Sequence, residues 1–166
     1  ELRELWGTGM AMIFQDPMTT LNPVRRIGAQ LTESLTVRLK LSKKEAHEQA
    51  IELLRRVRIA DPEGMMRKFP YQLSGGMRQR IMIAIAVSCK PELLFADEPT
   101  TALDVTVQAQ VLELLSELRK EFNMAMILVT HDLGVVAGHT DKIAVMYAGD
   151  VVEMAPTREL FTNMKM

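Results

Sequence analysis

Residues 73–80 read LSGGMRQR, and residues 93–99 read LLFADEP. The first stretch carries Ser-Gly-Gly at 74–76 ahead of an apolar segment, and a helix that begins this way exposes unpaired backbone N–H groups to an anion. The second is an apolar run that ends in two carboxylates, Asp97 and Glu98. Such a pair can serve one hydrated Mg²⁺ and one attacking water. Together the two stretches predict nucleotide hydrolysis.

These stretches resemble the signature motif and the Walker B strand of ABC transporter ATPases. Other matches follow in the family's order, with Gln15 in the Q-loop, Asp104 in the D-loop and His131 as the switch histidine. The resemblance covers essentially all 166 residues. Three segments are similar to the branch that imports oligopeptides, dipeptides and nickel: FQDPMTTLNP at 14–23, DEPTTALDVT at 97–106 and THDLGVVA at 130–137.

The strand end at residues 97 and 98 is expected to supply the catalytic carboxylates. Asp97 emerges where open α/β sheets bind ligands, so we expect it to hold Mg²⁺ through water. Neighbouring side chains on a strand diverge, and we expect Glu98 to polarise the attacking water as base or positioner. Without the surrounding motifs, a solvated strand end would be the simpler interpretation of both residues.

The resemblance implies roles for residues that follow two other strands. Gln15 would offer its amide oxygen to Mg²⁺ or to the attacking water. His131 would contact the γ-phosphate of ATP, and the near-neutral pKa of a histidine suits that role. The implied catalytic residues are therefore Glu98, His131 and Gln15.

The signature is expected to act on nucleotide held by another subunit. The resemblance implies that Ser74, Gly75 and Gly76 reach across a dimer to the γ-phosphate, and we group Gln79 with them as a nucleotide contact. The alternative is a helix N-cap with a tight turn, which needs only one glycine. Asp104 is either a local turn cap or, by the resemblance, a residue of the dimer interface at the nucleotide.

One part of the family's machinery is not in these 166 residues. No glycine is followed by Lys-Ser or Lys-Thr, so the phosphate-binding loop G-x-x-x-x-G-K-[ST] is missing. We expect an amino-terminal truncation, and the alternative is a natural subunit that lacks the loop. The fragment alone is expected to be inactive, whereas the full-length form would be an ATPase.

Composition excludes several classes of protein. The net charge of −1 gives no bulk attraction to nucleic acid or anionic lipid. Cys89 is the single cysteine, so no internal disulfide can form and a reducing cytosol is the natural setting. The apolar stretch at residues 81–87 is far shorter than the roughly 18 residues that a membrane span needs. Any association with the membrane must therefore come from a partner.

The apolar periodicity predicts one α/β domain with a helical insertion. Ser42 and Glu45 predict a capping box, and Asp61 precedes a short helix. After Pro91, strands and helices alternate, which indicates a parallel sheet covered by helices. The expected elements are strands at 10–15, 92–96, 125–130 and 142–146, helices at 106–121 and 133–137, then a strand at 151–155 and a helix from Pro156.

The resemblance implies a P-loop NTPase-like (RecA-like) α/β core with an inserted ABC helical subdomain, here without its phosphate-loop segment. We expect residues 1–166 to form a partial ABC ATPase domain. Its parts would be the Q-loop strand and loop (10–23), the helical subdomain with the signature (24–88), and the Walker B, D-loop and switch half of the core (89–166).

The leading hypothesis is the ATP-hydrolysing subunit of a prokaryotic ABC importer for peptides or a related small solute, at the cytoplasmic face of the membrane. Its cofactors would be ATP and Mg²⁺. Its partners would be a second ATPase subunit, transmembrane permease subunits and, indirectly, a solute-binding protein, with no nucleic acid. The alternatives are a soluble ABC ATPase acting on ribosomes or DNA, and a non-catalytic subunit that donates only its signature.

Overall fold

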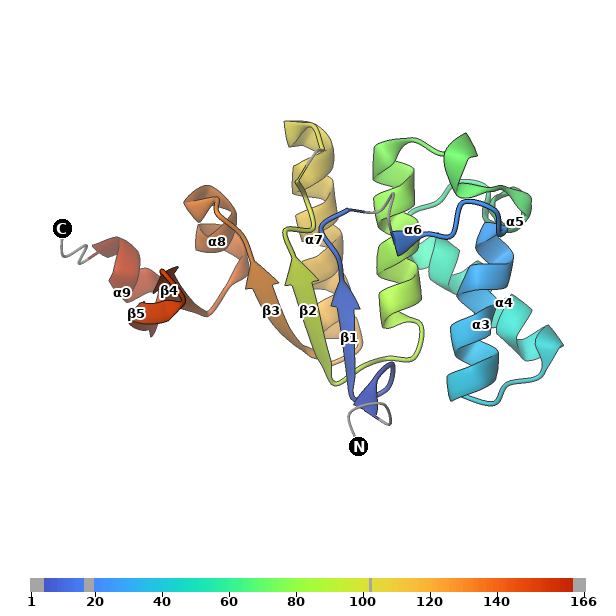
Figure 1. The fold of residues 1–166 in the computed structure, drawn as a ribbon, viewed down its shortest axis with the longest axis horizontal. Coiled ribbons are helices and arrows are strands. Elements are labelled where there is room, and N and C mark those ends of the chain that lie inside the picture. Colours follow the sequence, from blue (N-terminus) through green and yellow to red (C-terminus); the bar gives the residue numbers. More distant parts are fainter. Residues whose placement is uncertain (1–4, 17–19, 102, 163–166) are drawn as a thin grey trace.

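A three-stranded parallel sheet organises the computed structural model, which describes residues 5–16, 20–101 and 103–162. Residues 17–19 of the expected Q-loop segment and Ala102 of the expected D-loop lie outside the described residues. The strand order is β1 (Met10–Ile13), β2 (Leu93–Asp97) and β3 (Ala125–Val129). Met10 is paired with Leu93, and Leu93 with Ala125, so the three strands end along one edge (Figure 1).

The chain leaves the sheet after β1 and returns to it in β2. Between them the described residues include the helices α3 (Ile27–Arg38), α4 (Lys43–Arg56), α5 (Pro62–Arg67) and α6 (Gly75–Val87), with a 3-10 turn η1 (Pro70–Gln72) before α6. The predicted capping box is confirmed, because the Ser42 side chain accepts from Glu45 N and the Glu45 side chain accepts from Ser42 N. Asp61 caps α5 by a single contact, since its side chain accepts from Gly64 N.

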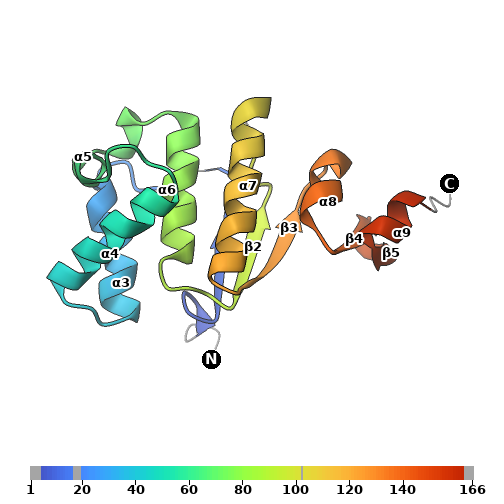
Figure 2. The same ribbon diagram turned by 180° about the vertical axis from the view of Figure 1, so that it is seen from behind.

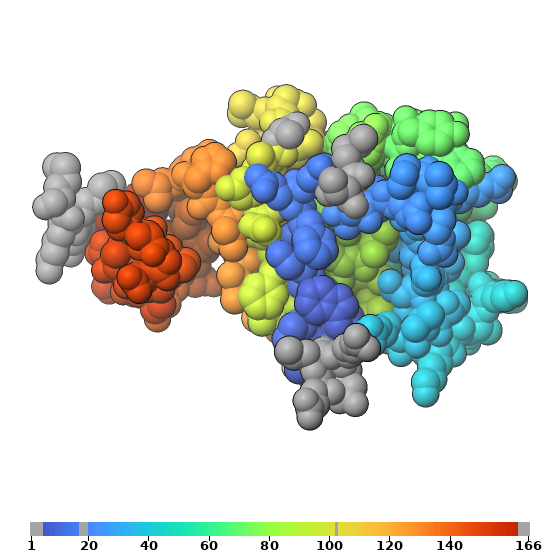
Figure 3. Space-filling view, in the orientation of Figure 1, coloured from blue at the N-terminus to red at the C-terminus, as the bar shows by residue number. Residues whose placement is uncertain are grey.

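Helices α6 and α7 (Val105–Glu121) lie behind the sheet, as the view from the back shows (Figure 2). The sheet turns Ile13, Leu94 and Ala96 toward this layer, where they are fully buried in one cluster with Leu114 and Leu115 of α7. No helix of the described chain covers the front of the sheet, where side chains of the three strands reach the surface (Figure 3). The hydrophobic core is therefore shared between the sheet and the helices on one side.

The last part of the chain departs from the predicted parallel sheet. The strand expected at 142–146 is present as β4 (Lys142–Tyr147), but it pairs antiparallel with β5 (Asp150–Pro156) in a separate two-stranded sheet. The two residues between them, Ala148 and Gly149, both have positive φ, +50° and +93°. Such a turn closes a tight hairpin and matches the twist of its strands. The prediction that β4 continues the parallel sheet was wrong.

Two short helices flank this hairpin, α8 (Leu133–His139) before it and α9 (Thr157–Thr162) after it. Both arrive near the predicted positions, and α8 runs two residues further than expected. Among the described residues, none of the helices combines the length and the apolar character that a membrane crossing requires.

Candidate functional site

The end of β2 places Glu98 at the meeting point of three strands. Its backbone N–H donates to the carbonyl oxygen of Val129, the last residue of β3, over 2.9 Å. Its φ is +42°, a left-handed conformation that non-glycine residues adopt rarely and often at functional sites. The backbone therefore leaves the extended conformation of β2 at Glu98, and the Glu98 side chain does not follow the alternation of the strand.

The carboxylate of Glu98 gathers donors from all three strand ends. Gln15, which follows β1, donates from Nε2 to Oε2 over 2.9 Å. Thr101 donates its hydroxyl to the same oxygen over 2.8 Å. His131, which follows β3, lies with Nδ1 3.0 Å from Oε1. Three residues predicted separately from the sequence, Gln15, Glu98 and His131, thus form one hydrogen-bonded group.

The contact between Glu98 and His131 lies near the surface and joins opposite charges when His131 is protonated. The side chain of Glu98 is 23% exposed and that of His131 is 76% exposed. The hydrogen bond from His131 is the main cause that lowers the pKa of Glu98, followed by the hydrogen bond from Thr101. The same contact with Glu98 raises the pKa of His131. The arrangement therefore favours an ionised carboxylate beside a protonated imidazole.

Asp97 is the last residue of β2 and is partly buried. No group of three or more His, Cys, Asp or Glu side chains that could hold a metal ion occurs in the part of the chain that the structure describes. Mg²⁺ does not need such a group, because it commonly keeps several waters and binds one or two carboxylates together with substrate phosphates. Asp97 therefore fits a partial magnesium site.

The Ser-Gly-Gly segment begins α6 at the same edge where the strands end (Figure 1). Ser74 is the N-cap, and its side chain accepts from Met77 N over 3.3 Å. A Cβ on Gly76 would lie 2.9 Å from Cγ1 of Val107 in the first turn of α7, closer than side chains tolerate. Gly76 thus has a packing role. A Cβ on Gly75 would meet only Leu103, at an ordinary 3.9 Å.

Two other predicted residues lie in more local settings. Gln79 is only 2% exposed, so the structure does not place it at the surface of the signature helix. Its Nε2 has no hydrogen-bond partner among the described residues. Asp104 is the N-cap of α7 and accepts from Val107 N over 3.0 Å, which agrees with the local interpretation of this residue.

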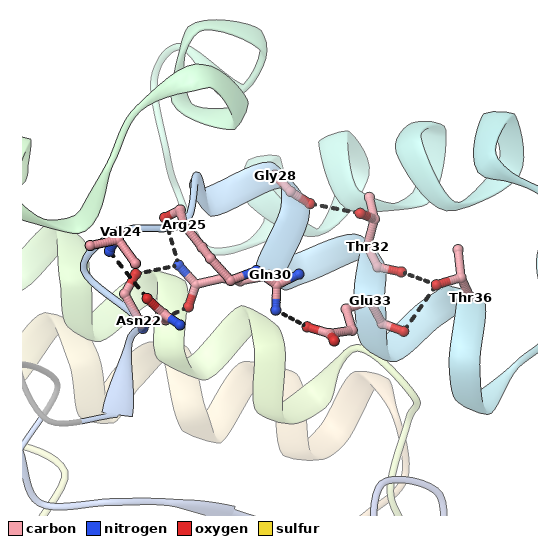
Figure 4. Close-up of polar contacts among 8 residues, drawn as sticks. All are labelled: Asn22, Val24, Arg25, Gly28, Gln30, Thr32, Glu33 and Thr36. Carbon is pink, nitrogen blue, oxygen red and sulfur yellow. Dashed lines mark hydrogen bonds and ion pairs between the residues drawn. The ribbon is translucent and has the colours of Figure 1, made fainter.

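A hollow with a volume of about 420 Å³ lies between β1, α3 and α6, and Glu98 does not line it. One side of it carries an ion pair between Arg25 and Glu33, whose atoms Nη1 and Oε2 are 2.6 Å apart (Figure 4). Gln30 ties the preceding loop to α3, since its Nε2 donates to the carbonyl oxygens of Asn22 and Arg25. The loop after β1 is thereby held against the helices.

Sequence reasoning missed Thr101. The sequence Glu98-Pro99-Thr100-Thr101 could have indicated its role. Proline at the second position favours a β-turn, which brings the fourth residue, Thr101, close to the first, Glu98. The structure forms this turn, with Thr101 N donating to the carbonyl oxygen of Glu98 over 3.1 Å.

Comparison with known proteins gives consistent relatives. The family model described as ABC transporter matches residues 1–101. A probable peptide ABC transporter ATP-binding protein of Sinorhizobium fredii is 53% identical over 163 residues, which are 98% of this chain and 49% of that protein. An oligopeptide transport ATP-binding protein of Salmonella typhimurium is 54% identical over 161 residues, 97% of this chain and 48% of that protein. The chain thus spans about half the length of the curated relatives it matches.

Solved structures resemble the whole fold. The ATP-binding cassette MJ0796, solved as a dimer in a post-hydrolysis state with ADP and Pi, gives a TM-score of 0.81 at 28% identity, covering 95% of this chain and 66% of that one. The protein cbiO1 of Clostridium perfringens, part of an ABC transporter complex, gives 0.80 at 29% identity, covering 99% of this chain and 62% of that one.

Proposed function

This chain belongs to the ABC transporter family, and we propose that it is part of the ATP-hydrolysing subunit of a bacterial importer for peptides or related small solutes. The observation that carries the proposal is the convergence of Gln15, Glu98 and His131 from the ends of three parallel strands. The names of the relatives, which are ATP-binding proteins of peptide and oligopeptide transporters, support the solute class.

We assign hydrolysis to the group around Glu98. An ionised Glu98 would accept the proton of the water that attacks the γ-phosphate, or would orient that water. His131 binds Glu98 through Nδ1, which leaves Nε2 to contact the γ-phosphate. Asp97 would hold Mg²⁺ through water. Gln15 would add its amide oxygen, because the hydrogen bond to Glu98 uses only its Nε2. Mg²⁺, when bound, would neutralise charge on the transferred phosphoryl group.

We assign Ser74, Gly75 and Gly76 to the nucleotide of a second ATPase subunit. Their place at the start of α6 gives backbone N–H groups and the positive end of a helix dipole, both of which suit phosphate. The dimeric form in which MJ0796 was solved supports a second copy or a similar subunit as the partner. Asp104 would lie close to that interface while it caps α7.

We assign contact with the permease to the helices of residues 24–88, taken as the helical subdomain, and to the loop after Gln15. The hollow beside Phe14, Leu21 and Met82, with the Arg25–Glu33 pair on its rim, would receive a segment of a transmembrane permease subunit. The protein would then lie at the cytoplasmic face of the membrane, and a solute-binding protein would act through the permease. A net charge of −1 argues against nucleic acid as a partner.

Hydrolysis by the complete gene product tests this proposal. The protein, purified with its permease in lipid vesicles, should hydrolyse ATP in a magnesium-dependent manner, and hydrolysis should accompany the uptake of peptide into the vesicles. Absence of both ATP binding and ATP hydrolysis in the purified complex would overturn the proposed function. Hydrolysis without peptide uptake would overturn the solute class alone.

A further inference from the structure

The turn that follows β2 fixes the backbone of Glu98 from two directions. Glu98 N donates to Val129 O over 2.9 Å, and Glu98 O accepts from Thr101 N over 3.1 Å. Pro99 sits at the second position of this turn, where its fixed φ restricts the alternatives. The position of the Glu98 Cβ is therefore well determined. The direction of the carboxylate beyond it depends on side-chain contacts.

Of the three donors to that carboxylate, Thr101 is the most local. Its hydroxyl is part-buried and lies three residues along the same turn, 2.8 Å from Oε2. Threonine has a single restricted side-chain rotation, so this contact costs little conformational entropy. Gln15 and His131 reach Glu98 from the ends of two other strands, and His131 is 76% exposed. Those two side chains are also the ones assigned above to Mg²⁺ and phosphate.

We propose that Thr101 is a positioning residue that holds the Glu98 carboxylate in the direction needed to act on the attacking water. This inference rests on the proposed function of ATP hydrolysis. Gln15 and His131 each contact Glu98 through one nitrogen and are assigned to magnesium and phosphate through their other polar atom, whereas the Thr101 hydroxyl contacts Glu98 alone. It acts only through Glu98 and touches neither nucleotide nor metal.

A purely structural role for Thr101 makes different predictions. The turn already has its own backbone hydrogen bond, so removal of the hydroxyl should leave the fold intact. The Thr101 hydroxyl contacts Oε2 of Glu98 over 2.8 Å, so its loss should free the direction of the carboxylate without moving the turn. A disturbance of the turn alone would not be corrected by restoring the hydroxyl.

The test compares Thr101→Val, Thr101→Ser and Thr100→Val in the complete gene product. Valine keeps the shape of threonine without its hydroxyl, and kcat should fall about tenfold while KM for ATP stays nearly unchanged. Serine keeps the hydroxyl and should stay within about threefold of the parent. Thr100→Val is the matched control in the same turn, and we expect no more than about a twofold change.

A second readout does not depend on hydrolysis. The crystal structure of Thr101→Val should show the Glu98 carboxylate turned from the direction that it has in the parent and in Thr101→Ser, with the turn unchanged. If the parent itself lacks ATPase activity, the proposed function fails, and the direction of the carboxylate still decides whether Thr101 positions Glu98. If Thr101→Val does not fold, Thr101→Ala removes the same hydroxyl with less bulk.

Two results would overturn the inference about Thr101. One is an unchanged kcat and an unchanged direction of the Glu98 carboxylate in a folded variant without the hydroxyl. The other is an equal loss of kcat in Thr101→Ser and Thr101→Val, since that pattern would mean that the hydroxyl is not the group that matters.

Discussion

Replacement of Gly76 by alanine would place a Cβ 2.9 Å from Cγ1 of Val107, at the contact between α6 and the first turn of α7. Valine is stiff about its first side-chain rotation, so the clash must be relieved by moving α7 rather than by a rotamer change. Overpacking of this kind costs about 1–3 kcal/mol. Alanine also restricts the unfolded chain, which offsets the cost by about 0.4–1 kcal/mol.

The net expectation for Gly76→Ala is a loss of about 1 kcal/mol in the free energy of unfolding. Gly75→Ala is the matched control, since its Cβ would meet Leu103 at 3.9 Å and should leave the free energy unchanged or higher by up to about 1 kcal/mol. Urea unfolding of the complete gene product, followed by circular dichroism, measures both.

A double variant checks that the clash is with Val107. Gly76→Ala combined with Val107→Ala removes the opposing methyl groups, so its loss should be smaller than the sum of the two single losses. The expected coupling is about 0.5–3 kcal/mol. Equal stability of Gly76→Ala and Gly75→Ala would refute the argument that Gly76 is required for close packing of the two helices.

Two further predictions concern charge and capping. The imidazole of His131 should titrate above the ordinary histidine value in proton NMR, because a raised pKa means that Glu98 stabilises its protonated form. That contribution to stability is present at low pH while Glu98 stays ionised, and it is lost as pH rises through the raised pKa of His131. Glu98→Gln should return the His131 midpoint toward the ordinary value. An identical midpoint in the parent and in Glu98→Gln would contradict the role of Glu98. Asp104→Ala should cost about 1 kcal/mol by removing the cap of α7, whereas Asp104→Asn should keep most of it, and equal losses in urea unfolding would contradict the capping role.

Features that depend on neighbouring residues were predictable from the sequence. The capping box of Ser42 and Glu45 is confirmed because both partners lie within one helical turn. The predicted order of strands and helices is also confirmed up to β3. Strands and helices repeat their apolar residues at different spacings, so the sequence distinguishes them. The grouping of Gln15 with Glu98 could be anticipated, since parallel strands end at one edge of a sheet.

Apart from the common edge at which the parallel strands end, features that depend on tertiary contacts were not predictable. The pairing of β4 with β5 follows from a turn with two positive φ angles, Ala148 and Gly149, and the alternating order of elements gives no sign of it. The burial of Gln79 depends on how α6 packs, because a polar residue on a helix is expected at the surface. The packing role of Gly76 depends on where α7 lies, and no local pattern reports that position.

The most direct test of the account is the rate of ATP hydrolysis by Glu98→Gln in the complete gene product. The amide keeps the shape of the side chain but cannot take a proton, so ATP binding should persist while hydrolysis falls on the order of 10²–10⁴-fold. Glu153→Gln, on the exposed strand β5, is the matched control and should hydrolyse ATP like the parent. Turnover by Glu98→Gln within a few-fold of the parent would contradict the assignment of hydrolysis to Glu98.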